Sequence, residues 1–198
     1  MFANISYRFN GELQGYFKYV RETGDACEKY NFDPLLVDGK KVCLGFFEAG
    51  YTQGGNKHGK SRHVHIEKID DAFKNVNSAT GLTVVWCSSI KPLGRTAIVG
   101  WYTNAEVFRR VKVLPFGEIP GRGSPENGYV YNVVAVKTTC VHFPFAEIIS
   151  PKWGVPKSRS HGFGIGRYMW YANEPEAKDY VANIFNEISQ YSGENLIS

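Results

Sequence analysis

The sequence predicts an α+β fold, in which a strongly curved, mostly antiparallel sheet or a small β-barrel carries a packed C-terminal helix. Three observations support this prediction. Aromatic residues make up 15% of the chain, and 21 glycines with 9 prolines supply many turns. Short apolar segments bounded by turn residues recur through the middle of the chain. One amphipathic repeat with a helical period follows near the end.

The 198 residues fit a single domain, because no linker or internal repeat divides the chain. We expect residues 42–191 to form its core barrel and terminal helix, with residues 1–41 as an N-terminal elaboration. Hydrophobic residues at 43% and charged residues at 21% are typical of a folded, soluble protein.

Several segments have the composition of strands. Residues 82–89 (LTVVWCSS) and 96–108 (TAIVGWYTNAEVF) are predicted to form a hairpin, because Pro92 and Gly94 supply a turn between them. The other predicted strands are residues 2–9, 42–48, 62–69 (RHVHIEKI) and 128–137. Residues 11–22 have near-helical spacing of apolar residues and are predicted to form a short helix.

A terminal helix is predicted after residue 173. Asn173 is a suitable N-cap, and Pro175 suits the first turn. Apolar side chains then recur at intervals of three or four, and the helix should lie against the sheet on this side. They are Ala177, Tyr180, Val181, Ile184, Phe185, Ile188 and Tyr191.

The four cysteines are far apart in the sequence and include no C-x-x-C pair. This spacing indicates neither a zinc ribbon nor a dense disulfide framework, so we expect reduced, mostly buried thiols in a cytoplasmic protein. The first residues lack the basic start and apolar run of a signal peptide. No apolar stretch reaches the length of a membrane span.

Basic residues are unevenly distributed, although the net charge is only +4. Residues 56–63 and 151–168 contain lysine and arginine but no acid, whereas acidic residues gather after position 173. Such basic segments could orient a phosphate backbone, and ordinary solvated loops are the alternative. The expected phosphate contacts are Lys57, Lys60, Arg62, Arg109, Arg110, Lys157, Arg159 and Arg167.

Residues 160–173 (SHGFGIGRYMWYAN) place three glycines before an aromatic run. The spacing is not G-x-G-x-x-G and the glycines do not open a helix, which excludes a phosphate-binding loop. We expect a turn in which the glycines let the backbone come close to a ligand or to a neighbouring strand, followed by a strand whose alternate rings line a pocket. A plain turn into a core strand is the alternative.

His63, His65 and Glu67 alternate along one predicted strand, as metal ligands or an acid–base pair would. The sequence identifies no further metal ligand, and it contains no G-x-S-x-G nucleophile motif. We therefore expect a protein without catalytic residues, cofactor or metal. A catalytic domain centred on these three residues stays open as an alternative.

Aromatic residues gather in three short segments, and two of these contain adjacent pairs, Trp101–Tyr102 and Trp170–Tyr171. Neighbouring side chains on a strand point to opposite faces, so one ring of each pair is expected in the core and the other beside a ligand. Such rings could stack on a base, and the Asn104 amide could contact its edge. The expected base pocket comprises Trp86, Trp101, Tyr102, Asn104, Trp170 and Tyr171. A tryptophan-rich core is the alternative.

The ordered blocks IEKI, VVW, IVGWYTNAEVFR and GFGIGRYMWYA resemble N-terminal regions that accompany HNH-type nuclease or helicase modules in bacterial restriction systems. The central pair of strands also resembles the PUA-like superfamily, which includes EVE and YTH domains. Those domains bind a flipped or single-stranded modified base between aromatic side chains. Together the blocks cover most of the chain from about residue 50 to residue 191.

This resemblance implies a DNA-binding specificity module that recognises a modified base by flipping it into an aromatic pocket. The expected base is a cytosine derivative. A nuclease or helicase module, in the same protein or a neighbouring subunit, would be its partner. An RNA-binding module with the same fold is one alternative. A protein–protein module with exposed aromatic anchors is another.

Overall fold

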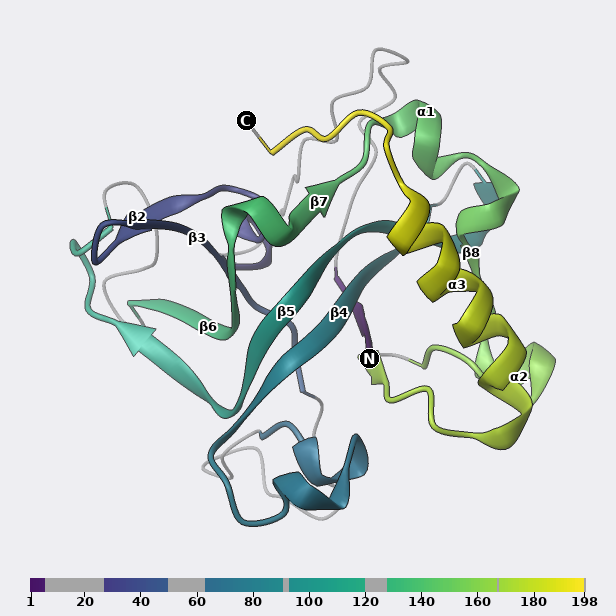
Figure 1. Ribbon diagram of the computed structural model, residues 1–198, viewed down its shortest axis with the longest axis horizontal. Helices are drawn as coiled ribbons and strands as arrows, with labels where there is room; N and C mark the ends of the chain where they lie inside the picture. The colour runs from purple at the N-terminus through teal and green to yellow at the C-terminus, as the bar shows by residue number, and fades with distance from the viewer. Residues whose placement is uncertain (6–26, 50–62, 91–92, 120–127, 167, 198) are drawn as a thin grey trace.

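The computed structural model describes residues 1–5, 27–49, 63–90, 93–119, 128–166 and 168–197. Nine strands in this part form one mixed, mostly antiparallel sheet, and a helix follows near the C-terminal end (Figure 1). The predicted α+β class is confirmed. Within the described ranges the sheet is not closed, so the barrel alternative is not observed. The helix predicted for residues 11–22 lies outside these ranges.

The strands are β1 (Phe2–Asn4), β2 (Leu35–Val37), β3 (Lys40–Gly45), β4 (Ser78–Ile90), β5 (Arg95–Leu114), β6 (Tyr129–Val136), β7 (Cys140–His142), β8 (Gly154–Val155) and β9 (Met169–Trp170). The short helical turns are η1 (Cys27–Tyr30), η2 (Ile66–Lys68), η3 (Asp71–Phe73), η5 (Lys137–Thr139), α1 (Phe145–Ile148), η6 (Pro151–Trp153), α2 (Ser158–His161) and η7 (Pro175–Ala177). The longest helix is α3 (Lys178–Gln190).

Strand β5 is the axis of the sheet, and the β4–β5 ribbon runs through the middle of Figure 1. β4 pairs with β5 in antiparallel register as far as Ile90↔Arg95, which confirms the predicted hairpin. The other edge of β5 pairs in turn with β8, β7 and β6. β1 lies between β4 and β9, parallel to the first and antiparallel to the second. The predicted N-terminal elaboration therefore contributes an inner strand.

The core fills both faces of the sheet around the β4–β5 ribbon. Residues 84–88 and 96–102 are buried without interruption, which requires cover on both faces. The cysteines Cys43, Cys87 and Cys140 are reduced and buried. No helix in the described ranges is both long and apolar enough to cross a membrane.

The terminal helix packs on this core and is continuous with η7. Pro175 occupies its first turn as predicted, but the N-cap is Glu174 and not Asn173. The Asn173 amide instead donates to the carbonyl oxygen of Lys68 at 3.2 Å. Ile184 is buried, whereas Phe185, which was expected on the packed side, is 41% exposed.

Candidate functional site

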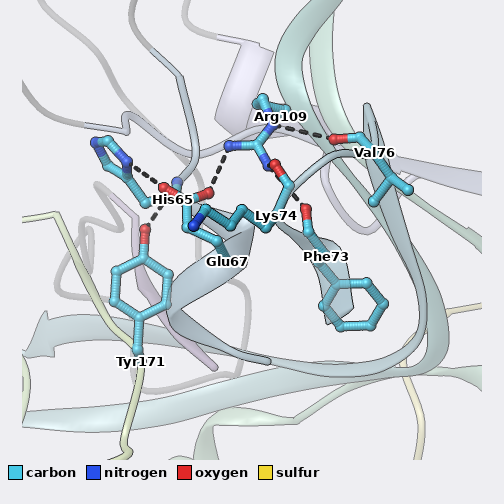
Figure 2. Close-up of polar contacts among 7 residues, drawn as sticks. All are labelled: His65, Glu67, Phe73, Lys74, Val76, Arg109 and Tyr171. Carbon is cyan, nitrogen blue, oxygen red and sulfur yellow. Dashed lines mark hydrogen bonds and ion pairs between the residues drawn. The ribbon is translucent and has the colours of Figure 1, made fainter. Parts of the chain in front are cut away.

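Residues 63–77 form a polar turn against β5, and the strand predicted for residues 62–69 is wrong. The chain makes one bridge to β5, at His63↔Arg110, and then turns through η2 and η3. The turn is held by the Arg109 guanidinium (Figure 2). That group donates to three carbonyl oxygens of the turn, those of Phe73 at 2.8 Å, Lys74 at 3.1 Å and Val76 at 3.1 Å.

Glu67 links this turn to a histidine. Its Oε2 accepts from Arg109 Nη1 at 2.5 Å, and its Oε1 lies 2.8 Å from His65 Nδ1. Partial burial raises the pKa of Glu67, but hydrogen bonds from its own backbone, from His65 and from Arg109 outweigh this and hold the pKa at about 2. The ionised carboxylate can only accept, so His65 Nδ1 carries a hydrogen and Nε2 is the basic nitrogen of the neutral ring.

Tyr171, the residue that follows β9, contacts the same group of side chains. Its hydroxyl oxygen accepts the backbone N–H of His65 at 3.0 Å, and Lys68 Nζ lies 5.7 Å from its ring centroid. Burial raises the pKa of Tyr171 to about 12, so the hydroxyl keeps its hydrogen at neutral pH. The next residue, Ala172, has a φ of 60°, a left-handed conformation that non-glycine residues adopt at a cost.

The His63 ring also belongs to this group, because its centroid lies 4.4 Å from that of His65. His65 is 34% exposed at its side chain, and His63 and Tyr171 are partly exposed. We call this set the His65 cluster. It comprises His63, His65, Glu67, Lys68, Arg109 and Tyr171.

Most of the expected base-pocket rings are core residues. Trp86 and Tyr102 are 0% exposed, and their ring centroids lie 5.1 Å apart. Trp101 is also buried, so the prediction that one ring of the Trp101–Tyr102 pair faces outward is wrong. Both faces of the sheet are covered here: Tyr102 contacts Phe32 on one face, and Trp101 contacts Phe143, Trp153 and Tyr191 on the other. All three rings are therefore buried in the core.

The second adjacent pair follows the predicted geometry. Trp170 is buried against Phe2 and Tyr180, while Tyr171 reaches the partly exposed His65 cluster. Asn104 is exposed on β5 with a φ of 52°, next to a register shift in the β4–β5 pairing. It is not part of the cluster.

The residues expected to contact phosphate differ in their exposure. Arg109 is turned inward, where its donors already serve Glu67 and the carbonyl oxygens of the turn, so it is a structural residue. Arg110, Lys157 and Arg159 are exposed, as a phosphate contact requires. The other four lie outside the described ranges; they are Lys57, Lys60, Arg62 and Arg167.

Phe163, which lies between Gly162 and Gly164, lines a separate hollow of about 380 Å³. Gly162 ends α2 with a φ of 77°, and Gly164 has a φ of 120°. A Cβ at Gly164 would lie 2.2 Å from the carbonyl oxygen of Pro156, which confirms the predicted close approach of two backbones. Six of the lining residues are Arg95, Val155, Pro156, His161, Phe163 and Tyr180. The sequence analysis had assigned none of these residues to a binding site.

In the described part of the chain, no group of three or more His, Cys, Asp or Glu side chains has an arrangement that could hold a metal ion. The His65 cluster therefore offers stacking rings, cations and one His–carboxylate pair. No family model, curated protein or solved structure matches this chain.

Proposed function

We propose that this protein is a DNA-binding specificity module that recognises a modified base, as the targeting domain of a modification-dependent restriction system. The observation that carries the proposal is the His65 cluster. His63, His65 and Tyr171 are partly exposed rings, and the Lys68 ammonium group lies 5.7 Å from the Tyr171 ring centroid. Proteins that bind single-stranded nucleic acid commonly combine aromatic rings, which stack on bases, with cationic side chains, which contact phosphates.

The electrostatics of the cluster favour a phosphate backbone. Its one carboxylate, Glu67, is paired with Arg109, so it does not repel an anion strongly. Arg110, the bridge partner of His63 on β5, is exposed, and the basic residues 56–62 precede His63 in the sequence. Cations at such a surface bind DNA by releasing its counterions.

Recognition of a modified base rests on the ordered sequence blocks that resemble restriction-associated N-terminal regions and PUA-like domains. We extend the proposal to a PUA-like arrangement, in which a curved sheet and its terminal helix support a flipped base. Base flipping costs a few kcal/mol, which stacking and edge hydrogen bonds offset. A nuclease or helicase module would then act on the marked DNA in the cytoplasm.

Fluorescence anisotropy with matched duplexes tests this function. We expect the protein to bind a duplex with 5-methylcytosine or 5-hydroxymethylcytosine more tightly than the unmodified duplex. Lys68→Gln and Arg110→Gln should weaken binding to all duplexes alike and lower the log–log salt slope by nearly one unit each. Lys41→Gln, at an exposed site on β3, is the matched control and should change neither.

Three results would count against the proposal. Equal affinity for all duplexes removes modified-base recognition, and tighter binding to the matching RNA reassigns the module to RNA. Absence of binding at low salt removes nucleic-acid recognition altogether.

Acid–base catalysis is a second candidate, favoured by the 2.8 Å contact between His65 Nδ1 and Glu67. A carboxylate that orients a histidine in this way prepares Nε2 to accept a proton. A cleavage assay on DNA and RNA, with and without a chelator, tests it. Turnover that disappears in His65→Ala but survives in Arg110→Gln would support catalysis, and no turnover in the wild type would end it.

A further inference from the structure

We infer that the hollow beside α2 is the site that receives the unstacked base, an inference that rests on the proposed function. Rings form much of its lining: His161 comes from α2, Phe163 from the glycine turn and Tyr180 from α3. Its volume of about 380 Å³ lies at the small end of the range of about 300–1,000 Å³ for ligand pockets. A single planar ring system suits a site of this size and lining.

The hollow is also rigid where a ring would stack. Phe163 is backed by Trp170, with ring centroids 6.1 Å apart. The Tyr180 hydroxyl donates to the carbonyl oxygen of Gly154 at 3.0 Å, which fixes that ring between α3 and β8. The contact of Gly164 with Pro156 fixes the turn that carries Phe163. Such preorganisation lowers the entropy lost on binding.

Arg95 supplies hydrogen-bond donors at the edge of the hollow. Its guanidinium has five N–H groups. Three hydrogen bonds, to the carbonyl oxygens of Ile149 at 2.6 Å, Ser150 at 3.0 Å and Pro151 at 3.4 Å, hold it in place. The remaining N–H groups can donate to a ring nitrogen or carbonyl oxygen of a base.

His161 supplies an acceptor. Its Nδ1 lies 3.3 Å from the carbonyl oxygen of Lys157, and because a carbonyl only accepts, Nδ1 carries the hydrogen. Nε2 of the neutral ring is then an acceptor. A donor and an acceptor together match the edge of cytosine, which presents acceptor atoms beside an exocyclic amine.

The positive charge around the hollow suits a base that is part of a nucleic-acid strand, because such a base has a phosphate on either side. None of the described lining residues is acidic, and one of them is Arg95. Lys157 follows the lining residue Pro156, and Arg159 lies on α2, both exposed beside the hollow. These cations can hold the phosphates on either side of the inserted base.

The experiment compares binding to duplexes that carry a central cytosine, 5-methylcytosine or abasic site, by fluorescence anisotropy. The wild type should bind the 5-methylcytosine duplex about tenfold more tightly than the abasic duplex, as stacking of one base provides. Phe163→Ala and His161→Ala should bring this ratio close to one, while affinity for the abasic duplex stays within about twofold. Phe185→Ala, at an exposed phenylalanine on α3, should leave the ratio unchanged.

Thermal melting accompanies each variant, and because His161 is exposed its truncation tests the hollow without disturbing the core. A base-to-abasic ratio unchanged in His161→Ala and Phe163→Ala would overturn the hollow as the base site, with DNA binding intact. A wild type that binds both duplexes equally would overturn it too. A wild type that binds neither would remove the proposed function and this inference together.

Discussion

Arg109 decides the course of the turn that carries the candidate site. One guanidinium bonds a carboxylate and three carbonyl oxygens of residues 67–76. Its planar fork satisfies these acceptors in a way that the point charge of a lysine does not. The side chain is a structural support for His65 as well as a counter-ion for Glu67.

Replacing Arg109 by glutamine should therefore lower stability and loosen the His65 cluster. We expect a loss of about 2–3 kcal/mol, because Glu67 would lose its charged partner and several carbonyl oxygens would lose their donors. Urea denaturation measures this loss. Arg110→Gln, at the exposed neighbour, is the matched control and should stay within about 0.5 kcal/mol of the wild type. Equal stability of the two variants would contradict a structural role for Arg109.

Glu67 should make stability depend on pH in the acid range. Its pKa in the folded protein is about 2, against an ordinary value of 4.5. The unfolded chain therefore binds the proton more tightly, and the contribution of Glu67 is complete above about pH 4.5 and falls as the pH drops towards 2. Melting temperatures between pH 2.5 and 6 should fall less steeply in Glu67→Gln than in the wild type. Glu118→Gln, at an exposed carboxylate, should reproduce the wild-type slope.

At the scale of elements, the strands and the helix predicted correctly are those with a clear local sequence pattern. The β4–β5 hairpin, most of β3 and β6, and the terminal helix have long apolar periods or clear turn residues. β7 and β8 are too short to produce a period and were not predicted, whereas β9 lies within the strand predicted after the glycine turn. Residues 62–69 were wrongly predicted as a strand, because the course of the turn at residues 63–77 depends on Arg109, which is distant in sequence.

The glycine turn after α2 offers a test of an element with a matched control. Gly164→Ala would place a methyl group against the Pro156 carbonyl at a φ of 120°, whereas Gly166 has open space around it. We expect Gly164→Ala to cost about 1–3 kcal/mol or more and Gly166→Ala less than about 1 kcal/mol. Chemical denaturation compares them. A similar small loss in both would show that the turn adapts to a side chain.

At the scale of the whole molecule, the sequence did not predict which rings of the expected base pocket are buried. Alternation along a strand assigns two faces to Trp101 and Tyr102, but it does not say what covers each face. Here Phe143 and Trp153 cover one and Phe32 covers the other. The rings that remain partly exposed, such as Tyr171 and Phe163, lie in or beside turns, where the sequence has no period to indicate exposure.

His142, a partly buried histidine beside the core, should have an effect on the stability of the entire fold. His142 stacks on Phe32 with ring centroids 4.1 Å apart, and burial lowers its pKa to about 4 from an ordinary 6.5. The unfolded chain then binds more protons between these values. Stability should fall as the pH drops from 6.5 to 4, by up to about 1.4 kcal/mol per pH unit.

Urea denaturation at several pH values measures this slope, and His142→Gln should flatten it even though the variant is less stable throughout. His161→Gln, at an exposed histidine, is the control and should keep the wild-type slope. A slope between pH 6.5 and 4 that is the same in both variants would show that His142 is not buried in its neutral form.

The position of β1 has a consequence for the order in which the protein acquires its structure. Phe2 pairs with Val85 on one side and with Trp170 on the other, so the earliest strand of the chain has two partners that are synthesised much later. The antiparallel β4–β5–β6 ribbon can assemble from neighbouring segments, whereas β1 must wait on the ribosome for β4 and then for β9. We therefore expect the pairing of β1 to be among the later steps of folding, after the β4–β5–β6 ribbon has formed.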